Sequence, residues 1–331
     1  MKKLFVTLLV VLCALSLFAS GQTETQQTSS KLTKVRVAYM PNYASLNSVV
    51  AAMKTGAFAE EGIEVELVEF ADGPTIIAAM ESGSIDVGYI GHGAHKLCIN
   101  GRAKIFAMSH IGNGDAVIGL KSHGVNSVAD LKGKKVGYAS GTSSEIILKW
   151  ALESEGLSMK DVVGMEMDAS GIVSAMNSGS LDAAACWSPS TFIIQDANKD
   201  DAVKLADNVA FSDRSASISS WIVMNKWAEQ NRDLLIRYTR ALYKGMDYRA
   251  ENVEQTAKWV AETIGADYDT MYMQRGDAEW ITSSELIAQI KDGTVEKAYE
   301  AQKSGFGDAV NQNTKVSDYV MFDVMLEAAE K

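Results

Sequence analysis

Residues 79–87 read AMESGSIDV, and residues 175–183 read AMNSGSLDA. Each stretch predicts the end of a helix, a turn and the start of a strand, because a glycine after a helical run favours the left-handed conformation that ends helices. Gly83 and Gly179 hold that position, and Asp86 and Asp182 begin the strands that follow. The repeat therefore indicates two copies of one structural unit, and its own serines and aspartates need not contact a ligand.

Both stretches lie within a longer strand–helix–strand–helix–strand order. In the first unit, the residue patterns predict strands at 34–39, 63–70 and 85–90, and helices at 45–58 and 73–83. In the second unit, the corresponding strands are 134–139, 162–167 and 181–187, and the helices are 143–156 and 171–179. This alternation is typical of an α/β fold with a mostly parallel sheet, flanked by helices and connected by right-handed crossovers.

Each unit is complete enough to form a small core of its own, so the domain organisation follows from the repeat. We expect residues 121–218 to form a second lobe, inserted into a first lobe made of 34–120 and 219–331. The segments 117–124 and 217–225 read as extended crossings between the lobes. No third α/β unit follows, and the mostly helical C-terminal residues should pack back on the first lobe.

The N-terminus reads as an export signal. Lys2 and Lys3 precede a short apolar run, and small residues follow, so residues 1–21 are predicted to be a cleaved signal peptide and 22–33 a disordered spacer. A lipid anchor would need Cys13, but a bulky leucine precedes that residue and the apolar run continues past it. The expected location is periplasmic, with membrane association left open.

Charge and cysteine content exclude several classes of protein. The net charge of −11 disfavours a nucleic-acid partner. Export would permit a disulfide, yet Cys98 and Cys186 both lie in apolar stretches and are expected to be buried thiols. No C-x-x-C or H-E-x-x-H spacing occurs, so no metal site and no cofactor is predicted.

The loops that follow the predicted strands carry the candidate ligand-binding residues, because ligands of open α/β sheets bind beyond the carboxyl ends of the strands. The candidates of the first unit are Asn42, Tyr43, Ser45, Asp72, Thr75, Gly91 and His92. Those of the second unit are Ser140, Gly141, Thr142, Ser143, Asp168, Trp187 and Ser188.

Each candidate also has an ordinary structural interpretation. The sequence SGTSS at 140–144 offers hydroxyls and backbone N–H groups to an acidic group of a solute, but Thr142 or Ser143 would equally cap the helix. Asp72 and Asp168 are equivalent in the two units, and either binds a solute ammonium or caps its helix. Trp187 is either a ligand contact or a packed surface residue, and three further aromatic side chains could frame a ring: Tyr43, His92 and Trp221.

Four blocks of the chain resemble solute-binding proteins of bacterial ABC importers. The blocks are FAEEGIEVELVEFADG (58–73), AAMESGSIDVGYIG (78–91), SVADLKGKKVGYASGTSS (127–144) and SGSLDAAACWSPS (178–190). They are similar to the branch that includes binders of taurine, aliphatic sulfonates, nitrate and pyrimidine precursors of thiamine. The resemblance implies a two-lobed periplasmic-binding-protein fold, a small-molecule solute, and a membrane permease with ATPase subunits as partners. A monomer is expected.

The solute stays open at this point. A sulfonate such as taurine is the best candidate, a pyrimidine or a flavin-type vitamin precursor is the alternative, and nitrate also stays open. A pyrimidine-forming enzyme of similar fold is a less favoured interpretation, because the cysteine-rich stretch associated with that chemistry is missing and no G-x-S-x-G motif occurs. We therefore expect a binding protein rather than an enzyme.

Overall fold

The computed structural model describes residues 32–330, and the predicted signal peptide and most of the predicted spacer lie outside this range. The described chain contains two five-stranded sheets. The first has the order β2-β1-β3-β10-β4, with β2 at Ile63–Glu69, β1 at Thr33–Tyr39, β3 at Val87–Ile90, β10 at Ile218–Val223 and β4 at Lys104–Ile111. Strand β10 is antiparallel to both of its neighbours, so the other four strands share one direction.

The second sheet repeats this plan. Its order is β7-β6-β8-β5-β9, with β7 at Val163–Glu166, β6 at Lys135–Tyr138, β8 at Ala183–Trp187, β5 at Asp115–Leu120 and β9 at Ala202–Asp207. Here β5 is the single antiparallel strand. The prediction of two mostly parallel sheets is confirmed.

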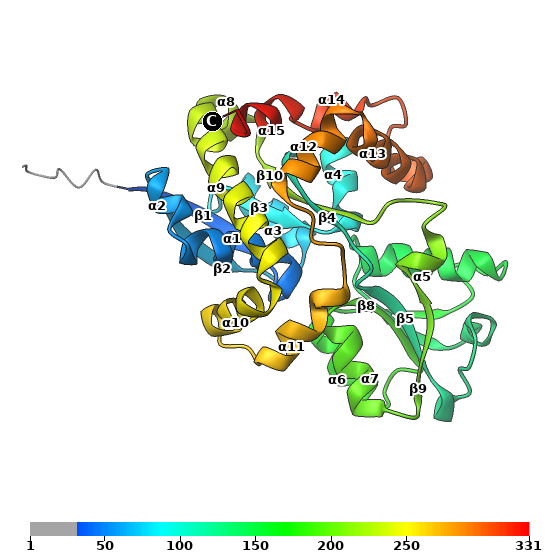
Figure 1. Ribbon diagram of the computed structural model, residues 1–331. Coiled ribbons are helices and arrows are strands. Elements are labelled where there is room, and N and C mark those ends of the chain that lie inside the picture. Colours follow the sequence, from blue (N-terminus) through cyan, green and yellow to red (C-terminus); the bar gives the residue numbers. More distant parts are fainter. Residues whose placement is uncertain (1–31, 331) are drawn as a thin grey trace, which may run out of the picture. The chain divides into compact units, whose positions relative to one another are not determined.

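Helices flank both sheets (Figure 1). The first unit contributes α1 (Tyr43–Lys54), α2 (Ala57–Glu60), α3 (Gly73–Glu81), the 3-10 turn η1 (His92–Ala94) and α4 (His95–Ile99). The second contributes η2 (Lys121–His123), η3 (Val128–Leu131), α5 (Ser143–Ser154), α6 (Ala169–Asn177), α7 (Ser190–Asn198) and η4 (Asn208–Phe211). The single helix expected over 45–58 is two, because Gly56 takes a φ of 83° between α1 and α2.

The C-terminal residues are helical, as predicted. They form α8 (Asn225–Gln230), α9 (Arg232–Glu251), α10 (Val253–Ile264), α11 (Tyr268–Met273), η5 (Gln274–Gly276), α12 (Ser283–Lys291), α13 (Thr294–Gly305), η6 (Gly307–Ala309), α14 (Val316–Tyr319) and α15 (Phe322–Ala328). None of the helices in residues 32–330 is long and apolar enough to cross a membrane.

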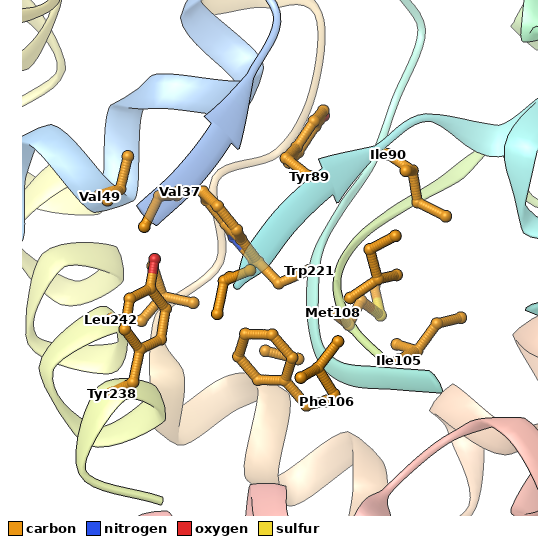
Figure 2. Packing of buried hydrophobic residues seen from close by; sticks show 14 of the residues in the cluster. Val37, Val49, Tyr89, Ile90, Ile105, Phe106, Met108, Trp221, Tyr238 and Leu242 are labelled. Atoms are coloured by element: carbon orange, nitrogen blue, oxygen red, sulfur yellow. The ribbon is translucent and has the colours of Figure 1, made fainter. Parts of the chain in front are cut away.

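The C-terminal helices pack on the first sheet. Figure 2 shows Tyr238 and Leu242 of α9 beside Phe106 of β4 and Trp221 of β10. The rings of Phe106 and Tyr238 meet edge to face with centroids 5.9 Å apart. Trp221 is fully buried in this core. It therefore does not frame a solute ring as the sequence suggested, because both faces of β10 are covered.

The two repeated stretches have the same structural role in the two sheets. Gly83 and Gly179 have φ values of 77° and 68°, which confirms the predicted left-handed helix ends. The carboxylate of Asp86 accepts the backbone N–H of Arg36 at 2.9 Å, and that of Asp182 accepts the N–H of Lys135 at 2.8 Å. Each aspartate thus fixes its own strand to the neighbouring strand of the sheet, and the repeat has a purely structural role.

The chain crosses between the sheets at 112–114, from β4 to β5, and at 208–217, from β9 to β10. The segment 117–124, expected as a crossing, instead consists of the end of β5 and the turn η2. Strand β5 pairs only within the second sheet, because β8 and β9 cover its two edges. The proposed lobes, with boundaries at 120/121 and 218/219, remain a prediction, because residues 32–331 form one compact unit.

Candidate functional site

A cavity lies where the loops after the strands of both sheets meet. It offers about 80 Å³ to the centres of water-sized molecules, which is room for several waters or a small organic solute. Its lining is aromatic and polar, with two carboxylates. The side chains that carry this character are Asn42, Tyr89, His92, His110, Asp115, Thr142, Ser143, Trp187, Ser188, Ser217, Ser219 and Asp277.

Seven of the fourteen predicted residues line this cavity. They come from both units and are Asn42, Gly91, His92, Thr142, Ser143, Trp187 and Ser188. The other seven lie elsewhere: Tyr43, Ser45, Asp72, Thr75, Ser140, Gly141 and Asp168. The strand-end rule therefore leads to this cavity but does not select the side chains that line it.

The two equivalent aspartates cap helices. Asp72 accepts the N–H of Thr75 at 2.8 Å, and Asp168 accepts the N–H of Gly171 at 2.7 Å. Asp168 also lines a second hollow, which adjoins the cavity because Asn42 and Trp187 line both. Asp168 thus faces the approach to the cavity and not its interior.

Tyr43 and Ser45 turn away from the cavity into the protein. The Tyr43 ring packs edge-on against Trp280 with centroids 5.2 Å apart, and the Ser45 hydroxyl donates to the carbonyl of Met40. In the second unit, Gly141 takes a φ of 78°, and its N–H donates to Glu145. These residues shape the loops and do not face the solute space.

The hydroxyls at the start of α5 are already committed within the protein. Thr142 accepts the N–H of Ser144 at 3.2 Å and donates to the carbonyl of Ala139 at 2.7 Å. The Ser143 hydroxyl donates to a carboxylate oxygen of Asp115. The backbone of η1 also packs closely against the start of α5. Only glycine fits at position 93, because a β-carbon there would lie 2.4 Å from the Ser143 nitrogen. The geometry supports the helix-cap interpretation of 140–144.

Asp115 is a site residue that the sequence analysis missed. It begins β5 and is only 7% exposed. Its carboxylate accepts hydrogen bonds from Ser143, from Asn208 at 2.9 Å and from Ser217 at 3.5 Å. Burial raises its pKa, and these donors oppose the rise. Its position directly before the apolar run 116–120 was the one sequence signal that could have found it.

Asp277 is the second missed carboxylate, and it comes from outside both repeated units. It is 8% exposed and lies beside Gly114 and Ser188. Burial, together with the charge of Asp115, raises the pKa of Asp277 to about 7. Like charges in one enclosed site disfavour the ionised form of each other.

The segment 274–280 holds Asp277 in place. Gln274 accepts the N–H of Tyr43 at 3.0 Å, and Ala278 forms an isolated β-bridge with Gly112 at the crossing. At the other end, the Trp280 ring lies over the guanidinium of Arg249 at 5.2 Å. The segment is therefore anchored to α1, to the crossing and to α9.

The histidines in the lining are neutral. Burial lowers the pKa of both His92 and His110 to about 3. The Nδ1 atom of His92 lies 3.1 Å from the carbonyl of Ala216, while its buried Nε2 atom has no partner within residues 32–330. Because a carbonyl oxygen only accepts, Nδ1 carries the ring proton, and Nε2 is left as a buried acceptor.

The charged side chains of the cavity are therefore acidic. None of the described residues that line it is lysine or arginine. Arg249 is fully buried behind the wall, where it donates to Asn47 and to the carbonyl of Ser109. The site can bind N–H donors or a cation through Asp115 and Asp277, and it offers flat contact surfaces at Tyr89 and Trp187.

Several known proteins are similar to this chain in sequence or in fold. A family model described as NMT1/THI5 like matches residues 44–256. A protein of Brucella abortus (strain 2308) named as a binding protein, with no ligand in its name, is 33% identical over 261 residues, 79% of this chain and 81% of that protein. A protein of Bacillus subtilis (strain 168) named as aliphatic sulfonates-binding is 26% identical over 267 residues, 78% of this chain and 77% of its own.

A solved structure agrees with the architecture. The alkanesulfonate-binding protein SsuA from Xanthomonas axonopodis pv. citri, bound to MOPS, matches with a TM-score of 0.66 and 20% identity. The match covers 87% of this chain and 97% of that structure. At this identity the likeness concerns the fold alone, and it shows that the two helix-flanked sheets form the periplasmic-binding-protein fold.

Proposed function

The chain belongs to the NMT1/THI5-like family, and we propose that it is an extracytoplasmic solute receptor of an ABC import system. It captures a small organic solute that carries an ammonium group or another N–H donor. Relatives named as binding proteins support the receptor role. Permease and ATPase subunits are the implied partners, and export by residues 1–21 remains part of the proposal.

The observation that carries the choice of solute is the pair of buried carboxylates, Asp115 and Asp277. A nitrate or a simple alkanesulfonate would bring a further negative charge into a cavity that holds these acids and whose described lining has no cationic side chain. Taurine keeps its place as the best candidate because its ammonium complements the carboxylates, which are strong acceptors of charged donors. Its sulfonate would then meet the neutral polar side chains of the lining, among them Ser219.

An aminopyrimidine is the second candidate, and the aromatic lining favours it. Tyr89 and Trp187 offer flat apolar surface, and a ring amine would donate to the same carboxylates. Both retained candidates share the N–H donor as the recognised group.

Matched pairs of probes test this proposal. We expect taurine to raise the melting temperature of the mature protein, while isethionate, which replaces the ammonium by a hydroxyl, should raise it much less. The corresponding ring pair is 4-aminopyrimidine and 4-methylpyrimidine, which has no N–H donor. Equal or larger shifts with isethionate or ethanesulfonate would contradict donor recognition. Recovery of the bound probe unchanged after prolonged incubation separates a receptor from an enzyme.

A further inference from the structure

We propose that Asp115 and Asp277 share one proton in the ligand-free protein and that a cationic solute displaces it, so that capture of the solute releases a proton to the solvent. This inference rests on the proposed function, because it takes the solute to carry a positive charge. It goes beyond that function in coupling binding to proton release. The argument starts from the place of the two carboxylates.

The two carboxylates reach one cavity from separate parts of the fold. Asp115 begins β5 of the second sheet, and Asp277 comes from the C-terminal segment that bridges to Gly112. Gly114 directly precedes Asp115 in the chain and also lies against Asp277: a β-carbon on Gly114 would be 3.4 Å from a carboxylate oxygen of Asp277. Both side chains are more than nine-tenths buried. Two carboxylates in one enclosed site do not both ionise at ordinary cost, so one keeps a proton.

The hydrogen bonds decide where the charge and the proton lie. Asp115 accepts from three side chains, those of Ser143, Asn208 and Ser217, and donors stabilise an ionised carboxylate. Asp277 has only the nearby Ser188 hydroxyl, which also lies within hydrogen-bond distance of the Gly114 carbonyl and of Thr191. The pair therefore places its charge mainly on Asp115 and its proton mainly on Asp277. Strictly, the two acids titrate as a pair.

The surrounding titratable and charged groups do not neutralise the pair. They are Tyr89 of β3, His92 of η1, His110 of β4, Cys186 of β8 and Arg249 of α9. Burial keeps the two histidines uncharged, and it raises the pKa values of the tyrosine and the thiol. The guanidinium is the single cation of this group, and it donates to Asn47 and to a backbone carbonyl and not to either aspartate.

An entering ammonium changes this balance. It supplies the positive charge that both carboxylates need, so Asp277 loses its proton to the solvent as the solute binds. Since the pKa of Asp277 is about 7 in the empty cavity, the apparent affinity should fall roughly tenfold for each pH unit below that value. Well above pH 7 the proton is already gone, and binding should become independent of pH.

One test needs no ligand. Potentiometric titration of the wild type and of Asp277→Asn gives the proton uptake of this carboxyl group as a difference. We expect a difference of one proton with its midpoint near pH 7. The control is Asp267→Asn, because Asp267 is an exposed helix cap whose pKa is lowered by the Thr270 N–H. Its difference should have a midpoint below that of a free aspartate. A midpoint near pH 4 for Asp277 would overturn the proposal.

The second test counts protons during binding. Calorimetric titration of the wild type with taurine, near pH 6 in two buffers of different ionisation enthalpy, should show release of close to one proton per solute; near pH 8.5 it should show almost none. Binding near pH 6 without any dependence on the buffer would overturn proton displacement while leaving donor recognition intact. If taurine does not bind at all, the choice of solute fails instead, and the potentiometric difference still decides whether the pair holds a proton.

Discussion

Replacing Gly93 with alanine should wedge the two sheets apart at the cavity. Gly93 belongs to η1, and its backbone lies against Thr142 and Ser143 at the start of α5, which packs on the second sheet. A β-carbon on Gly93 would lie 2.1 Å from the carbonyl carbon of Thr142. Alanine fits the backbone of Gly93 itself, because its φ is not positive, so the clash acts between the two units and not within one.

The size of the effect follows from this distance. Ordinary contact of a β-carbon begins at 3.4 Å, so the two segments must separate by about 1.3 Å before alanine fits. Overpacking of this kind costs about 1–3 kcal/mol. If binding needs the two segments in the contact that the structure shows, the separated variant must meet this cost to bind, and the affinity should drop roughly 5- to 150-fold, since each 1.4 kcal/mol is a factor of ten. The stability of each unit should change much less.

Calorimetric titration with the amine probe that binds the wild type measures this drop, and thermal unfolding measures stability on the same samples. Gly276→Ala is the matched control, because its added methyl group would meet nothing within 4 Å and its φ is not positive. Small-angle scattering of the two ligand-free variants reports the separation directly. An affinity of Gly93→Ala within about twofold of wild type, with the melting temperature unchanged, would refute the role given to this contact.

Three further predictions concern stability. Asp86→Ala and Asp182→Ala should each lower the free energy of unfolding by roughly 1–3 kcal/mol in denaturant titrations, because each leaves a strand N–H without its acceptor. Solute affinity should stay unchanged, and loss of affinity at normal stability would indicate that the repeat contacts the ligand. Arg249→Met should cost at least about 1.5 kcal/mol, the value of one charge-assisted hydrogen bond, and an unchanged denaturation midpoint would contradict this. The pKa of His110 is lowered to about 3, so in acid this group binds its proton only after unfolding, and stability should fall as the pH drops below about 6.5. His110→Gln should remove up to about 1.4 kcal/mol per pH unit from that slope, and identical slopes would be evidence against a neutral buried histidine.

Local patterns were sufficient to predict the sheets. Strand alternation, helical spacing and glycines such as Gly83 indicate local backbone conformations, which depend mainly on residues close together in the sequence. The prediction of both units is therefore confirmed. The prediction of a crossing at 117–124 was wrong because the sequence of an apolar strand that is buried on both faces does not indicate which sheet the strand joins. Pairing partners far along the chain place β5 in the second sheet.

The site was only half predictable for a related reason. Residues such as Ser188 were found because they follow strands, and the carboxyl ends of parallel strands meet in space. Tyr43 was misplaced because the first residue of a helix sends its side chain inward or outward according to its packing, here against Trp280. Asp277 had no local signal at all, since its segment reaches the cavity only through tertiary contacts at Gly112 and Arg249.

Donor recognition by Asp115 and Asp277 is the central claim, and the chemical identity of the natural solute tests it most directly. The protein should be isolated from the extracytoplasmic fraction of its host without denaturation. Native mass spectrometry would then give the mass of any bound molecule, and high-resolution fragmentation its composition. The account predicts a small solute with an amine or ring-amine group. A bound nitrate, or an alkanesulfonate without an N–H donor, would contradict it.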